Sequence, residues 1–328
     1  MANLLKLLLV VLAVAACESA PPPAPPAPPK PWAIERVEAQ GALVSVWGSS
    51  ANDVWAVGGS AGHGLVLHND GHNWAPVYTG ATSMLWWVYG IGATDVYAAG
   101  ERGLVMRHAA AGWQTVPTGT TKNLYGVWGR DAGDVWAVGG DPHGKPGDAV
   151  ILRGDSKGLH PVALPTEMVA NVMYKVYGTP AGDVVAVGAA GTILRFNGAW
   201  HREQVPTTAP VISLWGGGGE RLYAVGGDAT GELLYFDGAT WTKVGGVQAG
   251  LEFFGVFKAP GQPVLAVGAG PRILEMAPDG APVELDTPAL SGATVLHSVW
   301  GDGKGVQFAV GGTLYGDPDQ LTGVVLRR

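Results

Sequence analysis

The stretch Asp134-Val135-Trp136-Ala137-Val138-Gly139 decides the fold, because six related segments share its pattern. The seven segments end at Gly58, Gly100, Gly139, Gly188, Gly226, Gly268 and Gly311, so the unit recurs about every 42 residues. An alanine stands two places before each glycine, and a larger apolar residue precedes that alanine. Alternation of large and small side chains has the two-residue period of a β-strand.

The same local order surrounds each copy of this strand. A short apolar strand precedes it and ends in an aromatic residue, at Trp47, Tyr89, Trp128, Tyr177, Trp215, Phe257 and Trp300. A third strand follows, as in Leu65-Val66-Leu67-His68, and several units add a turn and a fourth strand that begins with Trp, as at Trp241. Four antiparallel strands every forty-odd residues are typical of a β-propeller blade, so seven units predict seven blades.

The two ends of the repeat region complement each other. The last unit stops after its third strand, at residues 324–328, whereas residues 31–37 precede the first unit and resemble a fourth strand. We expect Trp32 to Val37 to pair with that third strand, because this would cover two exposed sheet edges. The predicted fold is an all-β, seven-bladed propeller over residues 32–328, closed by its N-terminal strand.

The composition agrees with this fold and excludes some partners. The 328 residues include 52 Gly and 24 Pro, which weaken or break helix interiors, and only 14% are charged. The net charge of −7 argues against a nucleic-acid partner, which requires clustered cations. We expect a monomer without a cofactor.

The first residues have the pattern of an export signal. In residues 1–16, Lys6 precedes ten consecutive apolar residues, too few to span a bilayer. Val14-Ala15-Ala16-Cys17 resembles the bacterial lipobox, which implies lipidation of Cys17, and Glu18 favours outer-membrane sorting by the same resemblance. A plain secretory signal is the alternative. Residues 17–31 form a spacer after the signal, and its proline-rich part, residues 20–31, would extend about 37 Å at about 3.1 Å per residue.

The repeat unit also resembles known families. Asp134–Gly139 and Gly191–Trp200 are similar to the propeller repeats of photosystem II assembly factors and of secreted myxobacterial proteins. Residues 220–244 resemble a kelch repeat, with Tyr223, Gly226-Gly227, Tyr235 and Trp241. These resemblances imply the fold, whereas propellers host enzymes, lectins and scaffolds alike.

Two columns of the repeat carry charge. The third strands contain His68, Arg107, Arg153, Arg195 and Arg327, with Tyr235 and Glu275 in the other two units. The resemblance to assembly factors implies a basic binding stripe at the four arginines, and the alternative is solvated or locally paired strand residues. Asp53, Asp95, Asp134 and Asp183 stand five places before the repeat glycine. We expect them to cap the turn between strands one and two.

In each innermost strand, one residue stands two places before the strand-end aromatic, and these seven residues form a column of the repeat. It reads Ser45, Trp87, Gly126, Lys175, Ser213, Gly255 and Ser298. Small residues suit strands close to the axis, so Trp87 and Lys175 either fill the channel or mark a ligand. The column has no carboxylate, whereas a glycosidase needs two. His63, His68 and His72 lack a neighbouring set of carboxylates, so no metal site is expected.

Three long connections fall on one face of the predicted propeller, at residues 139–149, 226–232 and 311–323. They carry the candidate binding residues Asp141, Asp228, Asp317 and Asp319. Loops on a rigid scaffold often bind ligands, and insertion without function is the alternative.

The sequence therefore predicts a lipid-anchored binding or scaffold module of the bacterial cell envelope, with a protein or envelope glycan as partner. A carbohydrate-active hydrolase or lyase is the alternative function. Two carboxylates within about 10 Å of each other, in a pocket on the loop face, would favour the enzyme. A purely structural envelope protein is the third possibility, and it would show neither a pocket nor an apolar patch.

Cys17→Ser tests the lipid anchor. We expect the variant to lose acylation and to leave the membrane fraction, because the spacer and the propeller contain no other anchoring stretch. Fractionation followed by mass spectrometry of the N-terminal peptide measures both. Retention of the variant on membranes after a high-salt wash would contradict the lipobox interpretation.

Overall fold

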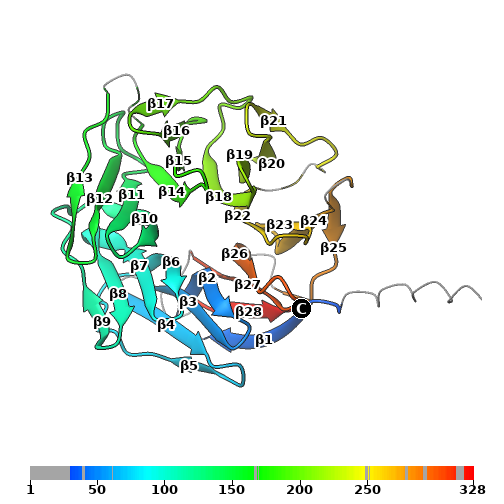
Figure 1. The fold of residues 1–328 in the computed structure, drawn as a ribbon. Helices are drawn as coiled ribbons and strands as arrows, with labels where there is room; N and C mark the ends of the chain where they lie inside the picture. Colours follow the sequence, from blue (N-terminus) through cyan, green and yellow to red (C-terminus); the bar gives the residue numbers. More distant parts are fainter. Residues whose placement is uncertain are drawn as a thin grey trace, which may run out of the picture. The chain divides into compact units, whose positions relative to one another are not determined.

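The computed structural model describes residues 30–38, 41–60, 62–165, 168, 170–247, 250, 252–277, 280–290, 294–314 and 321–328. Within Pro31–Arg328, one compact unit, seven four-stranded sheets surround a common centre (Figure 1). Cys17, Asp317 and Asp319 lie outside the described residues. The described residues include the short 3-10 helix η1 (Glu101–Gly103), and no described helix has the length and hydropathy to cross a membrane.

Each blade runs from the centre outward in chain order. Blade 1 holds β2 (Ala42–Ser50), β3 (Asp53–Ser60), β4 (His63–Asn69) and β5 (Trp74–Pro76). Blade 2 holds β6 (Leu85–Gly92), β7 (Asp95–Gly100), β8 (Val105–Ala109) and β9 (Gly112–Thr115). Blade 3 holds β10 (Asn123–Asp131), β11 (Asp134–Gly140), β12 (Val150–Asp155) and β13 (Gly158–Pro161).

The remaining blades repeat this arrangement. Blade 4 holds β14 (Met173–Gly178), β15 (Val184–Gly188), β16 (Ile193–Phe196) and β17 (Trp200–Arg202). Blade 5 holds β18 (Val211–Gly218), β19 (Arg221–Asp228), β20 (Thr230–Phe236) and β21 (Trp241–Lys243). Blade 6 holds β22 (Phe253–Lys258), β23 (Val264–Gly268), β24 (Arg272–Met276) and β25 (Val283–Leu285). Blade 7 holds β26 (Val295–Gly301), β27 (Gln307–Gly312) and β28 (Gly323–Arg327).

The fourth strand of blade 7 is β1 (Ala33–Glu38), from the other end of the propeller. It pairs antiparallel with β28, from Ala33 opposite Arg327 to Glu38 opposite Gly323. Trp32 is 5% exposed and joins the apolar cluster between the first and last blades. The predicted closure is therefore confirmed, and β28 is paired on both sides, with β27 and β1.

The inner strands contact one another through the strand-end aromatics. Neighbouring rings around the centre lie 5.1–6.5 Å apart between centroids, from Trp47–Tyr89 to Phe257–Trp300. At four of the seven junctions between blades, the aromatic reaches the glycine that follows the aromatic of the neighbouring blade. A Cβ on Gly90 would come within 2.1 Å of Trp47, and a Cβ on Gly178 within 2.0 Å of Trp128. Glycine is thus required there by the close approach of a neighbouring ring.

One face of the propeller, termed the loop face here, collects the starts of the inner strands. The connection between strands two and three of a blade meets the segment that enters the next blade, as in the bridge from Gly140 to Val172 and the hydrogen bond from Gly64 N to Ala81 O. Residues 139–149 form a long connection on this face, as predicted. Residues 226–232 do not, because β19 and β20 continue to the pair Asp228–Thr230, and Ala229 closes the hairpin at φ +64°.

Candidate functional site

Trp87 and Lys175 meet near the axis of the propeller, although they come from blades 2 and 4. The Lys175 Nζ lies 4.0 Å from the centroid of the Trp87 ring. Both residues are buried, with 8% of Lys175 and 6% of Trp87 exposed. The two exceptions to the column of small residues therefore form a single contact, the axial pair.

The small residues of the same column hold the inner strands together and leave room for the axial pair. In blade 3 the column holds Gly126, where a Cβ would approach the Lys175 Cα to 3.0 Å. In blades 1 and 7 it holds serines that bond to the next inner strand: Val88 N donates to Ser45 Oγ at 3.0 Å, and Val46 N to Ser298 Oγ at 3.3 Å. A larger residue at these positions would displace the neighbouring strand.

The Lys175 ammonium has one hydrogen-bond partner among the described residues, the Tyr125 carbonyl oxygen at 3.0 Å. It forms no ion pair with any described carboxylate. Burial lowers the pKa of Lys175 to about 7. Burial lowers the pKa of the His297 imidazole to about 3, and the nearby Lys175 charge contributes to this shift. The axis thus holds a cation whose charge the described part of the chain does not neutralise.

A ring of larger side chains surrounds the axis on the loop-face side of this pair. These residues stand three places before each strand-end aromatic, at the β-bulge of the inner strand: Val44, Trp86, Tyr125, Tyr174, Ile212, Phe254 and His297. We call them the channel-mouth ring. All except Val44 are partly exposed. Contacts run around the ring, with Trp86–Tyr125 at 5.5 Å, Tyr125–Tyr174 at 5.8 Å and Phe254–His297 at 5.1 Å between centroids.

The channel-mouth ring was not identified from the sequence as a candidate site. Four of its seven members are Trp, Tyr or Phe, which is a signal in the sequence. The signal was missed because the neighbouring column, one residue later, contains the conspicuous Lys175. A bulge between the two columns also breaks the simple two-residue alternation.

The arginine column lies toward the opposite face and pairs with the aspartate column of the same blade. Arg107 Nε and Nη2 donate to Asp95 at 2.6 and 3.0 Å, and Arg153 Nε donates to Asp134 at 2.9 Å. Arg195 binds both Asp183 and Glu203, His68 binds Asp53, and Arg327 binds Glu35. The four guanidinium groups also lie 4.7–5.9 Å from aromatic ring centroids.

These pairs change the interpretation of the aspartate column. We expected Asp53, Asp95, Asp134 and Asp183 to cap turns, but their side chains bond to the third strand, and two also accept from Trp55 Nε1 and Trp136 Nε1. The turn amides find other acceptors: Gly133 N donates to Asp131 and Asn52 N to Ser50 Oγ. The arginines of the predicted basic stripe are therefore paired locally, which leaves their role in binding a prediction.

Two of the candidate acidic residues, Asp141 and Asp228, lie on the loop face. Asp141 is exposed and accepts a hydrogen bond from His143 N at 2.9 Å. Asp148 in the same loop accepts from Lys122 Nζ at 2.8 Å, and the hydrogen bond from Lys122 and the one from the Lys145 amide lower the pKa of Asp148. Asp228 is exposed at the end of β19. The Asp141 and Asp148 side chains thus order their loop through hydrogen bonds with its backbone amides.

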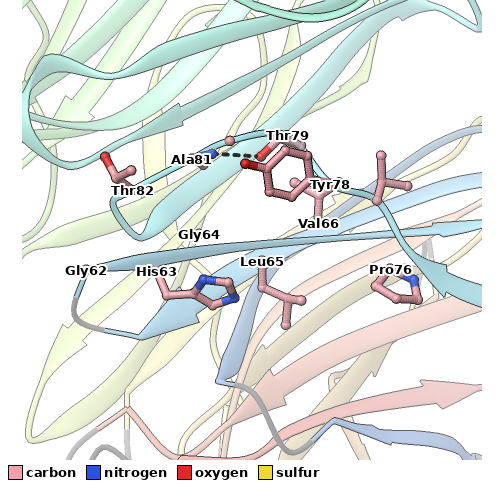
Figure 2. A pocket seen from close by; sticks show the side chains of 12 residues that line it. Gly62, His63, Gly64, Leu65, Val66, Pro76, Tyr78, Thr79, Ala81 and Thr82 are labelled. Carbon is pink, nitrogen blue, oxygen red and sulfur yellow. Dashed lines mark hydrogen bonds between the residues drawn. The ribbon is translucent and has the colours of Figure 1, made fainter.

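A pocket of about 440 Å³ opens beside β4 in blade 1 (Figure 2). His63, Leu65, Pro76, Tyr78 and Thr79 line it, with Tyr78 94% exposed, and Thr79 Oγ1 accepts from Ala81 N at 3.2 Å. Its lining contains no carboxylate. The described residues contain no group of three His, Cys, Asp or Glu side chains that could hold a metal ion, and His68 is bonded to Asp53 at 2.7 Å.

Comparison with known proteins supports the fold. No protein-family model matches the sequence, and no curated protein does. Among solved structures, YCF48 bound to D1 peptide aligns with a TM-score of 0.65 at 15% identity, over 91% of this chain and 96% of that chain. A streptogramin B lyase aligns at 0.70 and 12%, over 90% and 98%, and the WD40 propeller domain of Doa1 at 0.67 and 13%, over 90% and 96%. Identities this low show the propeller fold alone.

Lys175→Met tests the buried ammonium. The folded pKa of about 7 lies below the unfolded value of about 10.4, so burial of the charge destabilises the wild type most below pH 7, and this effect vanishes above about pH 10.5. We expect Lys175→Met to gain stability relative to the wild type at pH 6, by at most about 5 kcal/mol more than at pH 10. Urea unfolding at both pH values measures the difference.

The matched control is Lys157→Met, which removes an exposed lysine. It should change the free energy of unfolding by similar small amounts at the two pH values. A gain from Lys175→Met that is equal at pH 6 and pH 10 would show that the Lys175 amine is not desolvated.

Proposed function

We propose that this protein is a binding module that holds a protein partner on its loop face, over the channel-mouth ring. The observation that carries the proposal is the convergence of partly exposed Trp86, Tyr125, Tyr174 and Phe254 at one end of the inner strands. Large aromatic side chains bury much area at little entropic cost and dominate many interfaces. The inner strands on which they stand are fixed by both neighbouring blades.

The solved structures of similar fold are compatible with this role. The structure titled as YCF48 bound to D1 peptide is a propeller that holds a peptide, and it covers nearly the same length as this chain. The streptogramin B lyase supports the alternative of an enzyme on the same scaffold. The choice between them depends on the residues of this chain.

Those residues favour binding over hydrolysis. A glycosidase requires one carboxylic acid with a raised pKa beside a second carboxylate. Asp141 and Asp148 share one loop on the loop face, but both hold backbone amides of that loop, and the pKa of Asp148 is lowered. The pocket of Figure 2 has no carboxylate in its lining. Binding at the channel-mouth ring needs no such pair.

We also propose where in the cell the protein is located. Lipidation at Cys17 and the proline-rich spacer of residues 17–31 would tether the propeller outside the cytoplasm, at the cell envelope and, by the sequence after the cysteine, at the outer membrane. An envelope glycan is the second candidate partner, since aromatic side chains also stack on sugar rings. The composition of the ring favours a protein.

The double variant Tyr125→Ala, Phe254→Ala tests the proposed surface. Mature protein, immobilised and exposed to detergent-solubilised envelope, should capture a partner whose recovery falls at least tenfold in the variant, because truncation of two central aromatics removes a few kcal/mol of binding energy. Quantitative mass spectrometry of the captured proteins and glycans measures the change and identifies the partner class.

Tyr78→Ala is the matched control, because Tyr78 is an exposed aromatic in blade 1 outside the ring. Its capture should equal that of the wild type. Two further variants test the other candidate binding residues. One combines Asp141→Asn with Asp228→Asn on the loop face, and the other is Arg153→Gln in the arginine column. Full capture by the ring variant together with loss in Arg153→Gln would contradict the proposal and favour an acidic partner at the opposite face.

A further inference from the structure

The axial pair contains a buried cation that has no counter-ion among the described residues. Lysine is almost never fully buried unless its charge is paired, because the charge loses its hydration. The Lys175 ammonium can donate three hydrogen bonds, and the structure supplies one acceptor, the Tyr125 carbonyl. The Trp87 ring faces the ammonium at 4.0 Å, and the negative face of its π-system replaces only part of the lost hydration.

Other polar atoms around the axis also lack partners. Trp86 Nε1, Ser213 Oγ and His297 Nε2 are buried and form no hydrogen bond with any described residue. Ser213 is fully buried in the inner strand of blade 5, one blade from Lys175. Trp86 and His297 belong to the channel-mouth ring. The Trp86 indole N–H is a donor and the Ser213 hydroxyl can donate, so an acceptor that entered this region would find donors besides Lys175.

The channel-mouth ring lies between this region and the loop face. Its members Tyr125, Tyr174 and His297 are partly exposed, whereas Lys175, in the next column of the inner strands, is 8% exposed. A group that enters between the ring side chains would leave water and meet the ammonium. The apolar ring favours a ligand with an apolar part next to its charged group.

We propose that the axial region binds a carboxylate of the partner polypeptide, which pairs with the Lys175 ammonium, while its neighbouring apolar groups pack on the channel-mouth ring. This inference rests on the proposed binding function and specifies its chemistry. A carboxylate accepts several hydrogen bonds and carries the charge that Lys175 lacks. In the low-dielectric surroundings of the axis, the ion pair would be stronger than at the protein surface.

None of the groups that face Lys175 is a carboxylate that could pair with its charge. Tyr125 and Tyr174 approach from β10 and β14, Trp87 from β6 and His297 from β26, and all four are neutral when the imidazole has lost its proton. The exposed Asp141 and Asp228 lie on the loops of the same face. A partner that carries one carboxylate for the axis and cations around it would match both regions.

The probe that tests the axial site is 4-phenylbutyrate, compared with its neutral isostere 4-phenylbutanamide. Isothermal titration of the full mature chain at pH 6.5 should give a dissociation constant at least tenfold lower for the carboxylate. In Lys175→Met the ratio should fall below about two. Lys258→Met, on the inner strand of blade 6 at its opposite end, should keep the wild-type ratio.

A second measurement does not depend on how well a variant folds. NMR of 15N-labelled lysine in the wild type should show the Lys175 pKa rising by at least one unit when 4-phenylbutyrate binds. Equal affinity for the carboxylate and the amide, or a Lys175 pKa that does not move, would overturn the proposal. If capture of the envelope partner still depends on the channel-mouth ring in that case, the proposed function survives without the carboxylate site.

The source of the carboxylate is resolved with peptides of one sequence. One peptide ends in a free carboxylate, one is amidated, and one is amidated but carries an internal glutamate. Tighter binding of the first identifies a chain terminus, and tighter binding of the third identifies an acidic side chain. Equal binding of all three would contradict recognition of a carboxylate.

Discussion

Contact between a strand-end aromatic and a glycine of the next blade is the constraint on which the propeller depends. Trp300 reaches Gly48, Trp47 reaches Gly90, Trp128 reaches Gly178 and Tyr177 reaches Gly216, so the contact continues across the closure between blades 7 and 1. At these four junctions the inner strand is thereby held against the one before it. The outer strands pack on this frame, and β1 completes blade 7 by pairing with β28.

This constraint also sets the geometry of the candidate site. Trp87 and Lys175 stand two residues before Tyr89 and Tyr177, so the spacing of the aromatics fixes the spacing of the axial pair. Two serines of the same column, Ser45 and Ser298, bond instead to backbone amides of neighbouring inner strands. At the opposite face, pairs such as Arg107 with Asp95 join the second and third strands within one blade. The two faces therefore differ. The loop face presents the channel-mouth ring, whereas the opposite face carries ion pairs within blades.

The repeats predicted seven blades and the closing strand because strand period, glycine spacing and the orphan Trp32 segment are all local features of the sequence. Trp87 and Lys175 were conspicuous as exceptions in one column, but no sequence distance relates blades 2 and 4, so their contact could not be predicted. The aspartates were misinterpreted for a related reason. Turn capping is a local property, whereas the bond from Arg153 to Asp134 joins residues 19 apart across a hairpin. The channel-mouth ring was hidden by the bulge that precedes Lys175.

The central claim is that the aromatic–glycine contact between blades holds the propeller together. It is tested most directly by the free energy of unfolding in urea of Gly90→Ala, compared with Gly92→Ala two residues later on β6. A Cβ on Gly90 would lie 2.1 Å from Trp47, whereas a Cβ on Gly92 meets no atom within 4 Å. The account predicts a loss of about 1–3 kcal/mol for Gly90→Ala and a change within about 0.5 kcal/mol for Gly92→Ala. Equal stability of the two variants would contradict it.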